Sequence, residues 1–297
     1  MPRFQRLPAR IFLLLSLLLA CSKKPESSTQ PFIISAIPDQ DPERLQRLYG
    51  GVASYLSKEL GVPVSYKPVT DYTASVTAFK VGELDMVWYG GLTGVQARLQ
   101  VPGAHAIVQR DIDDQFHCVV LANKESGITD LSGLKGHTFT FGSESSTSGR
   151  LMPQYFLLQA GIKLSDFKGQ VGFSGSHDKT IKLVAAGAYE AGALNEQVWK
   201  KASEGGGPDL ERVRVIWTSP PLHDYHWVLH PDAAARYGAD FAAKVKAAFL
   251  KLDEKNPEHR PILELFGAKR FIATQDSNCE QIASIGRQVG LITDSAR

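Results

Sequence analysis

The sequence has few cysteines and almost no excess of charge of either sign. Only three of its 297 residues are cysteines, and Cys21 directly follows an apolar run, which leaves Cys118 and Cys279 for the folded part. At most one disulfide can join these two, and free buried thiols are equally compatible with their surroundings. The 33 basic and 31 acidic residues leave a net charge of +2. This balance gives no support for a nucleic-acid-binding protein or for docking on a membrane through a basic surface.

The sequence also lacks an apolar run long enough for a stable transmembrane helix. The run at Ile11–Leu19 is short, comes after three arginines and ends at Ala-Cys. A basic start, a short apolar run and a small residue before cysteine are typical of a bacterial lipoprotein signal. We therefore expect a signal peptide at 1–20, lipidation at Cys21 and a flexible Ser/Lys/Pro-rich tether at 21–30.

The rest of the chain has an ordinary globular composition and is long enough for about two domains, with strands and helices in alternation. The expected strands are 31–38, 62–68, 84–89, 104–109 and 116–122, with helices at 42–60, 72–81 and 92–99. This order predicts a parallel sheet with helices on both faces, and such sheets bind ligands beyond the carboxyl ends of their strands.

A second unit repeats the pattern from about residue 123. Its expected strands are 137–141, 171–173, 189–194 and 213–217, and its expected helices are 151–159 and 180–186. The segment 218–226 then crosses out of this unit, and a strand at 228–230 and helices at 233–253 and 278–289 come after it. The sequence thus predicts two α/β units.

The most informative stretch is 142–153, a junction of glycines and hydroxyls between an expected strand and an expected helix. The first turn of a helix has unpaired N–H groups and a partial positive charge, and Ser and Thr hydroxyls add donors. The stretch therefore favours an anion site. A plain helix cap is the alternative, although a cap needs one hydroxyl and residues 145–148 supply four.

Two other functions compete with this one. A serine hydrolase-like enzyme is suggested by Ser-x-x-Lys at Ser132 and at Ser176, but the companion motifs and a Gly-x-Ser-x-Gly elbow are missing. A metal-binding receptor is suggested by His223, His226 and His230, whose spacing would suit one helix face. Their surroundings predict a strand instead, on which the first two point to opposite faces.

Several motifs together resemble a known family. The segments 82–91, 145–149, 175–179 and 193–196 are similar to those of the phosphonate/phosphite/phosphate-type solute-binding proteins of ABC importers, and the resemblance spans 32–288. It implies an α/β, type II periplasmic-binding-protein fold, with two α/β lobes joined by a two-strand hinge. Lobe 1 would be discontinuous and comprise 31–118 plus 224–297, and lobe 2, with the crossover, would be 119–223.

The same resemblance implies no enzymatic activity, no cofactor and no metal. The partners it implies are a small oxyanion and an ABC permease in the cytoplasmic membrane, besides the bilayer that holds the lipid anchor outside the cytoplasm. The ligand-binding residues it implies are Tyr72, Tyr89, Ser145, Ser146, Thr147, Ser148, His177 and Asn195.

Segments 37–42 and 139–150 further resemble the branch described as selenate importer components. Selenate and sulfate carry no proton at neutral pH, whereas phosphate and many phosphonates can, and a site for these profits from a carboxylate acceptor. Because Asp71 is expected to cap a helix and Glu144 precedes the donors, the deciding acceptors are Asp39 and Glu196. We predict that neither contacts the ligand, which favours selenate with sulfate as competitor; a phosphonate-type ligand is the alternative.

Overall fold

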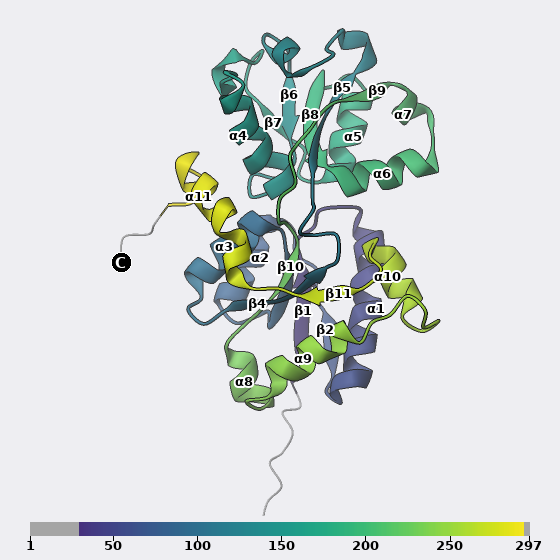
Figure 1. The fold of residues 1–297 in the computed structure, drawn as a ribbon, viewed down its shortest axis with the longest axis vertical. Helices are drawn as coiled ribbons and strands as arrows, with labels where there is room; N and C mark the ends of the chain where they lie inside the picture. Colours follow the sequence, from purple (N-terminus) through teal and green to yellow (C-terminus); the bar gives the residue numbers. More distant parts are fainter. Residues whose placement is uncertain (1–29, 294–297) are drawn as a thin grey trace, which may run out of the picture.

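The computed structural model describes residues 30–293 and forms two sheets, each covered by helices on both faces (Figure 1). The expected signal peptide, Cys21 and nearly all of the tether lie outside the described residues. Within the described part, no helix is long and apolar enough to cross a membrane.

The first sheet has the order β11-β4-β10-β3-β1-β2. Its strands are β1 (Phe32–Ala36), β2 (Val64–Tyr66), β3 (Met86–Tyr89), β4 (His105–Arg110), β10 (His226–Leu229) and β11 (Phe271–Ala273). The helices α1 (Pro42–Leu60), α9 (Phe241–Leu250) and α10 (Arg260–Phe266) pack together on it, while α2 (Tyr72–Lys80), α3 (Gly91–Gln100) and α11 (Glu280–Gln288) form a second group. The short α8 (Asp232–Tyr237) packs against α9.

The second sheet has the order β7-β6-β8-β5-β9. Its strands are β5 (Cys118–Asn123), β6 (Phe139–Phe141), β7 (Gly172–Phe173), β8 (Ala191–Asn195) and β9 (Val213–Thr218). Helix α4 (Met152–Gln159) lies on one side, and α5 (His177–Ala185), α6 (Glu196–Gly205) and α7 (Pro208–Glu211) lie on the other (Figure 1). Short helical turns complete this part: η1 (Lys124–Ser126), η2 (Leu131–Leu134), η3 (Thr147–Leu151) and η4 (Leu164–Asp166); η5 (Asp276–Cys279) precedes α11.

Helix α1 shows how closely local sequence sets these elements. The Asp41 carboxylate accepts a hydrogen bond from Arg44 N–H at 3.0 Å, and Pro42 occupies the first turn, where its missing N–H is not needed. Gly61 ends the helix with φ of 67°, a left-handed conformation that glycine adopts without strain. The predicted start and end of this helix are confirmed.

The alternation of strands and helices predicted parallel sheets, whereas both sheets are mixed. Strand β10 runs antiparallel to both of its neighbours, β3 and β4, and β5 runs antiparallel to β8 and β9. Strands β5 and β10 come directly after a segment that crosses from one sheet to the other, 111–117 before β5 and 219–225 before β10, and the edge strand β11 is likewise antiparallel to its neighbour β4. A strand that enters a sheet from the other lobe pairs with strands that are not its immediate neighbours in the chain, and periodicity carries no information on its direction.

Some elements of the C-terminal third were not predicted. The single helix expected at 233–253 is broken at Gly238, where φ is 106°, and α6, α10 and β11 were not foreseen. The two connecting segments, 111–117 and 219–225, run side by side as the only links of the sheets within the described residues. We propose that the boundaries between the lobes lie along these two segments, at 118/119 and 223/224 as the sequence predicts.

Candidate functional site

The turn after β6 folds back on itself through glycine. Gly142 N–H donates to the Gly149 carbonyl at 2.8 Å, and Gly149 N–H donates to Ser146 Oγ at 2.9 Å. A Cβ at Gly149 would lie 3.0 Å from Ser146 Oγ and 3.1 Å from Gly142 Cα, closer than side chains normally approach. The short sequence Gly-x₆-Gly therefore allows a tight turn that directs a helix start toward the other lobe.

The predicted hydroxyl run lies largely in the interior. Ser146, Thr147 and Ser148 are buried, and Ser145 is half-buried. Ser146 is the cap of the π-helical turn η3, so its oxygen acts as the plain helix cap that was the alternative to an anion site. Its hydroxyl proton remains available to donate. The first N–H groups of such a turn have no acceptor within it, which leaves donors free for an anion.

Thr147 connects this turn to the first lobe. Its Oγ1 accepts a hydrogen bond at 2.9 Å from Leu92 N–H, which lies in the first turn of α3. Gly90, the residue before helix α3, leaves room for this approach, because a Cβ there would lie 3.2 Å from Thr147 Oγ1 and 3.1 Å from Asp224 Oδ1. The hydroxyl turn thus faces a second helix start, with an aspartate between them.

Asp224 is a site residue that was not predicted from the sequence. It belongs to the connecting segment before β10, is buried, and accepts a hydrogen bond from Gly91 N–H at 2.8 Å through Oδ1. Its other oxygen, Oδ2, is buried and has no hydrogen-bond partner among the described residues. Burial raises its pKa to about 7, against the lowering effects of the Gly91 and Thr147 hydrogen bonds.

Tyr72 enters the same region from the start of α2. Asp71 caps that helix through Ala74 N–H at 2.7 Å, as predicted, and so fixes Tyr72 in the first helical turn. The Tyr72 side chain is buried, and its hydroxyl has no hydrogen-bond partner of normal geometry among the described residues. It lies near the Ser146 side chain and within the field of Asp224. A buried hydroxyl without a partner is rare and points to a ligand.

Tyr89 lies away from this group. Its hydroxyl donates to the Ser75 carbonyl at 2.9 Å, and its ring is fully buried against Phe79, with centroids 5.9 Å apart. The predicted ligand contact of Tyr89 finds no support here, because its only donor is already used inside lobe 1. Strand alternation explains the difference: the end of β3 directs this ring toward α2 and not toward the cleft.

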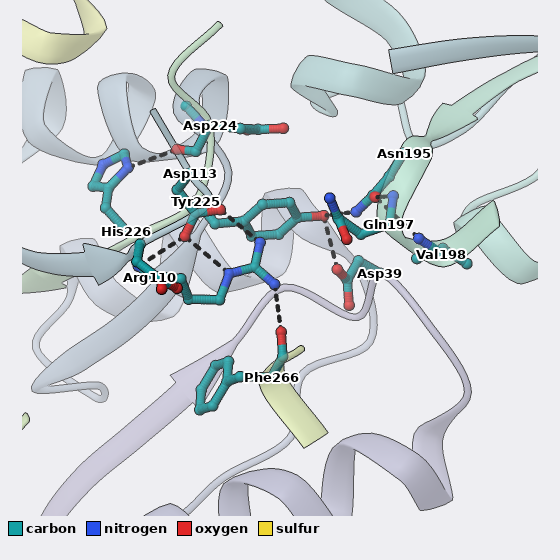
Figure 2. A network of polar contacts seen from close by, with 12 residues as sticks. Asp39, Arg110, Asp113, Asn195, Gln197, Val198, Asp224, Tyr225, His226 and Phe266 are labelled. Carbon is teal, nitrogen blue, oxygen red and sulfur yellow. Dashed lines mark hydrogen bonds and ion pairs between the residues drawn. The ribbon is translucent and has the colours of Figure 1, made fainter. Parts of the chain in front are cut away.

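Asn195 belongs to a hydrogen-bond network around Tyr225 that spans the two lobes (Figure 2), and His177 contacts the same tyrosine. Tyr225 Oη donates to Asp39 Oδ2 at 2.8 Å and accepts from Asn195 Nδ2 at 3.1 Å, while His177 Nε2 lies 3.4 Å from the same Oη. His177 N–H also donates to the Asp39 carbonyl at 2.9 Å. The β1–α1 loop of lobe 1 is thereby joined to the start of α5 in lobe 2.

The protonation of His177 is set by its neighbours. Asn195 N–H donates to His177 Nδ1 at 3.3 Å, which leaves the proton of a neutral ring on Nε2. Burial alone lowers the pKa of His177 to about 3, so the ring is neutral across the physiological range. Asn195 caps α6 through Gln197 and Val198 N–H, so its whole amide is committed to the network. These two predicted residues position Tyr225 at the site.

Asp39 and Glu196, the two acceptors on which the choice of oxyanion depended, both have partners. Asp39 is buried, and burial raises its pKa to about 6 despite the Tyr225 hydrogen bond and the nearby Arg110 charge. The Glu196 carboxylate pairs with Lys200 Nζ at 2.9 Å. The acceptor left without a partner at the cleft is therefore Asp224, which no sequence motif had marked.

A buried ion pair supports the network from the connecting segment (Figure 2). The Arg110 guanidinium donates to both carboxylate oxygens of Asp113, at 2.6 and 2.9 Å, and to the Phe266 carbonyl at 2.8 Å. It also lies 5.1 Å from the centroid of the Tyr225 ring and 5.5 Å from that of Trp88. A bidentate pair of this kind holds the backbone of the crossing in one geometry.

The histidines of the metal-binding alternative do not form a metal centre. His226 Nε2 lies 2.7 Å from Arg98 Nη1 and its Nδ1 lies 2.9 Å from the Asp224 carbonyl, while His226 and His230 lie at and just beyond the ends of a strand, not on one helix face. Among residues 30–293, no group of three His, Cys, Asp or Glu side chains could hold a metal ion. Cys118 and Cys279 are buried free thiols.

Comparison with known proteins agrees with this architecture. The family of ABC transporter, phosphonate, periplasmic substrate-binding proteins matches residues 34–279. A probable ABC transporter phosphite-binding protein, PhnD1, of Prochlorococcus marinus is 46% identical over 266 residues, which cover 87% of this chain and 90% of that protein. The phosphonates-binding periplasmic protein of Escherichia coli is 28% identical over 230 residues, covering 74% of this chain and 65% of that protein.

The solved structure of PhnD1 from Prochlorococcus marinus in complex with methylphosphonate superposes with a TM-score of 0.87 at 45% identity and covers 89% of this chain and all of that one. These relatives are solute-binding proteins and not enzymes, which confirms the non-enzymatic prediction and the two-lobed α/β fold, and the family implies a location outside the cytoplasm. None of these matches supports the narrower resemblance to a selenate branch. By the extent of the family match and its identity to PhnD1, this chain belongs to the periplasmic phosphonate-binding proteins of ABC transporters.

Proposed function

We propose that the protein captures a phosphonate, phosphite or phosphate between its two lobes, with one proton shared between ligand and site, and presents it to an ABC permease. The observation that carries this proposal is the free Oδ2 of Asp224, buried between the start of α3 and the hydroxyl turn of lobe 2. The names of the relatives, which refer to phosphite and methylphosphonate, point to the same ligand class.

The choice of ligand depends on the number of protons that the ligand and Asp224 hold between them. Selenate and sulfate are dianions without a proton at neutral pH, so they can share a proton with Asp224 only while that carboxyl is itself protonated. Once it ionises, with a pKa of about 7, it would face them with like charge. A phosphonate or phosphite monoanion has an O–H that can donate to Oδ2, and a dianion can instead accept from a protonated Asp224, whose pKa lies at about 7. Either arrangement leaves one proton between them.

The remaining groups supply donors for the other oxygens. The Tyr72 hydroxyl has no partner among the described residues, and Ser146, Ser148 and the N–H groups of η3 lie on the opposite lobe. In the observed arrangement Thr147 and His177 already join the two lobes, so both sets of donors could reach one tetrahedral ligand, and binding would select this closed arrangement. Ser145 and Thr147 frame the turn, and Tyr89 would not take part.

The test is calorimetry with methylphosphonate, phosphite, phosphate, sulfate and selenate on three proteins. The wild type should bind a phosphorus oxyanion most tightly. Asp224→Asn places an amide donor where an acceptor stood and should reduce that preference, so that sulfate and selenate gain relative to methylphosphonate. Glu196→Gln is the matched control, since its carboxylate already pairs with Lys200. Tighter binding of selenate than of every phosphorus oxyanion by the wild type would reject the proposal and restore the selenate interpretation.

We further propose that the mature protein is a lipoprotein anchored through Cys21 outside the cytoplasm. The support is the sequence pattern alone: a basic start, a short apolar run and Ala20-Cys21. The signal peptide would be residues 1–20, and the tether after Cys21 would let the lobes reach the permease.

A further inference from the structure

Arg150 is a buried arginine that forms no ion pair with the residues that the structure describes. It lies in η3, directly after the hydroxyl run, and is only 8% exposed. Its Nε and Nη1 atoms are buried without hydrogen-bond partners, and it forms no ion pair with any residue that the structure describes. Arg110 shows the usual solution in this same chain, a buried guanidinium neutralised by the two oxygens of Asp113.

Two aromatic rings hold the Arg150 side chain. Its guanidinium carbon lies 4.3 Å from the centroid of the Phe141 ring and 5.1 Å from that of Phe173. These rings stack on each other with centroids 6.0 Å apart. They come from the ends of β6 and β7, next to α4 in the upper lobe (Figure 1). Rings stabilise a cation only partly when it has left water, so they fix the position of the charge without neutralising it.

The location makes the charge more costly. A cation at the start of a helix opposes the helix dipole, which favours negative groups there. Burial is also the main reason that the pKa of Arg150 falls to about 10, with the Glu144 charge acting in the opposite direction. The fold therefore tolerates an unfavourable charge directly behind the turn that faces the cleft. An anion bound at that turn would supply the missing negative charge.

We propose that Arg150 is a positioning residue for ligand binding: clamped by Phe141 and Phe173, it adds positive potential to the hydroxyl turn without touching the ligand. The inference builds on the proposed function. Its substitution should therefore weaken anion binding while leaving the ligand-free protein equally or more stable. A residue with only a structural role would show the opposite sign in stability.

The test compares Arg150→Met, Arg150→Lys and Arg214→Gln with the wild type. Met keeps the length of the side chain and its contact with the rings but removes the charge, and Lys keeps the charge. Arg214 is the control, since it lies on β9 and donates to the Ile128 carbonyl at 3.0 Å, away from the turn. Methylphosphonate affinity is measured by calorimetry at low and high salt, and the ligand-free melting temperature by calorimetric scanning.

Arg150→Met should bind methylphosphonate more weakly by about tenfold or more, because it removes one elementary charge that acts on the anion through an effective dielectric of about 20. The loss should persist at high salt, because buried charges are screened little, and the melting temperature should stay or rise. Arg150→Lys should restore most of the affinity. Unchanged affinity in Arg150→Met, or a fall in melting temperature that Lys does not rescue, overturns the inference. If the wild type itself binds no phosphorus oxyanion, the proposed function fails and not this inference alone.

Discussion

Asp224→Asn tests the electrostatics of the site in the ligand-free protein. The carboxylate is buried, and one of its oxygens lacks a partner within the described part of the chain. Its pKa is raised from 3.8 to about 7 by burial. In that window the folded state binds more protons at this residue than the unfolded state, so the stability that the protonated form provides is lost as pH rises from 3.8 through about 7. Asparagine has no proton to lose.

The magnitude is given by the size of the shift. A rise from 3.8 to about 7 is roughly three pKa units, or about 4 kcal/mol at 1.36 kcal/mol per unit. Asp224→Asn should therefore match the wild type in stability below about pH 4 and exceed it by up to about 4 kcal/mol above pH 7. In melting temperature the difference would be on the order of 10 °C for a chain of this size.

The assay is thermal and denaturant unfolding of both proteins across this pH range, without ligand. Asp166→Asn serves as a control of opposite sign, since backbone and lysine contacts lower the pKa of this half-buried carboxyl and its contribution to stability grows as pH rises. A difference between Asp224→Asn and the wild type that is the same at every pH would refute the reasoning. So would a loss of stability in the variant above pH 7, because it would mean that the charged carboxylate is well satisfied.

Three further predictions concern other parts of the protein. Replacing Ser146 and Thr147 by Ala should weaken methylphosphonate binding in calorimetry by about 2 kcal/mol or more while the fold is kept; unchanged affinity would reduce the stretch to a helix cap. Cys21→Ser should release the protein from membranes on fractionation, and a variant that still carries lipid would show that the lipoprotein interpretation is wrong. Arg110→Met should lower the free energy of unfolding by about 3–5 kcal/mol, since it leaves Asp113 buried without its cation; denaturant unfolding measures this, and a change under about 1 kcal/mol would contradict it.

Local signals in the sequence predicted most of the elements because local chemistry determines them. The cap at Asp41, the proline after it and the left-handed Gly61 are all within a few residues of the helix ends they determine. The hydroxyl turn was predictable for the same reason, because its glycines and serines act within one loop. The reversed strands β5 and β10 were not predictable, since their direction depends on a partner far away in the chain or on the other lobe.

The site was harder to predict because half of it comes from the connections. Asp224 and Tyr225 precede β10, in a segment that has two prolines and the composition of a linker, and no motif marks either residue. A connecting segment between two lobes must nevertheless pass beside the cleft between them, so its polar residues are candidates by position. Applied to the sequence, that rule would have added Asp224 to the acceptors and weakened the argument for selenate.

The two buried carboxyls of the cleft, Asp39 and Asp224, have different roles. Asp39 accepts a hydrogen bond from the start of α5 in lobe 2 with its carbonyl, and its carboxylate accepts one from Tyr225, whose hydroxyl in turn accepts one from Asn195 of lobe 2. Asp224 has one oxygen on the start of α3 and leaves the other free. A fully bonded carboxylate can hold the lobes together but has little left for a ligand, whereas a partly bonded one is unstable until something donates to it. Whether a carboxylate joins the lobes, like Asp39, or is free to select the ligand, like Asp224, therefore depends on how many of its hydrogen bonds are already made. Neither composition nor a motif reveals that number.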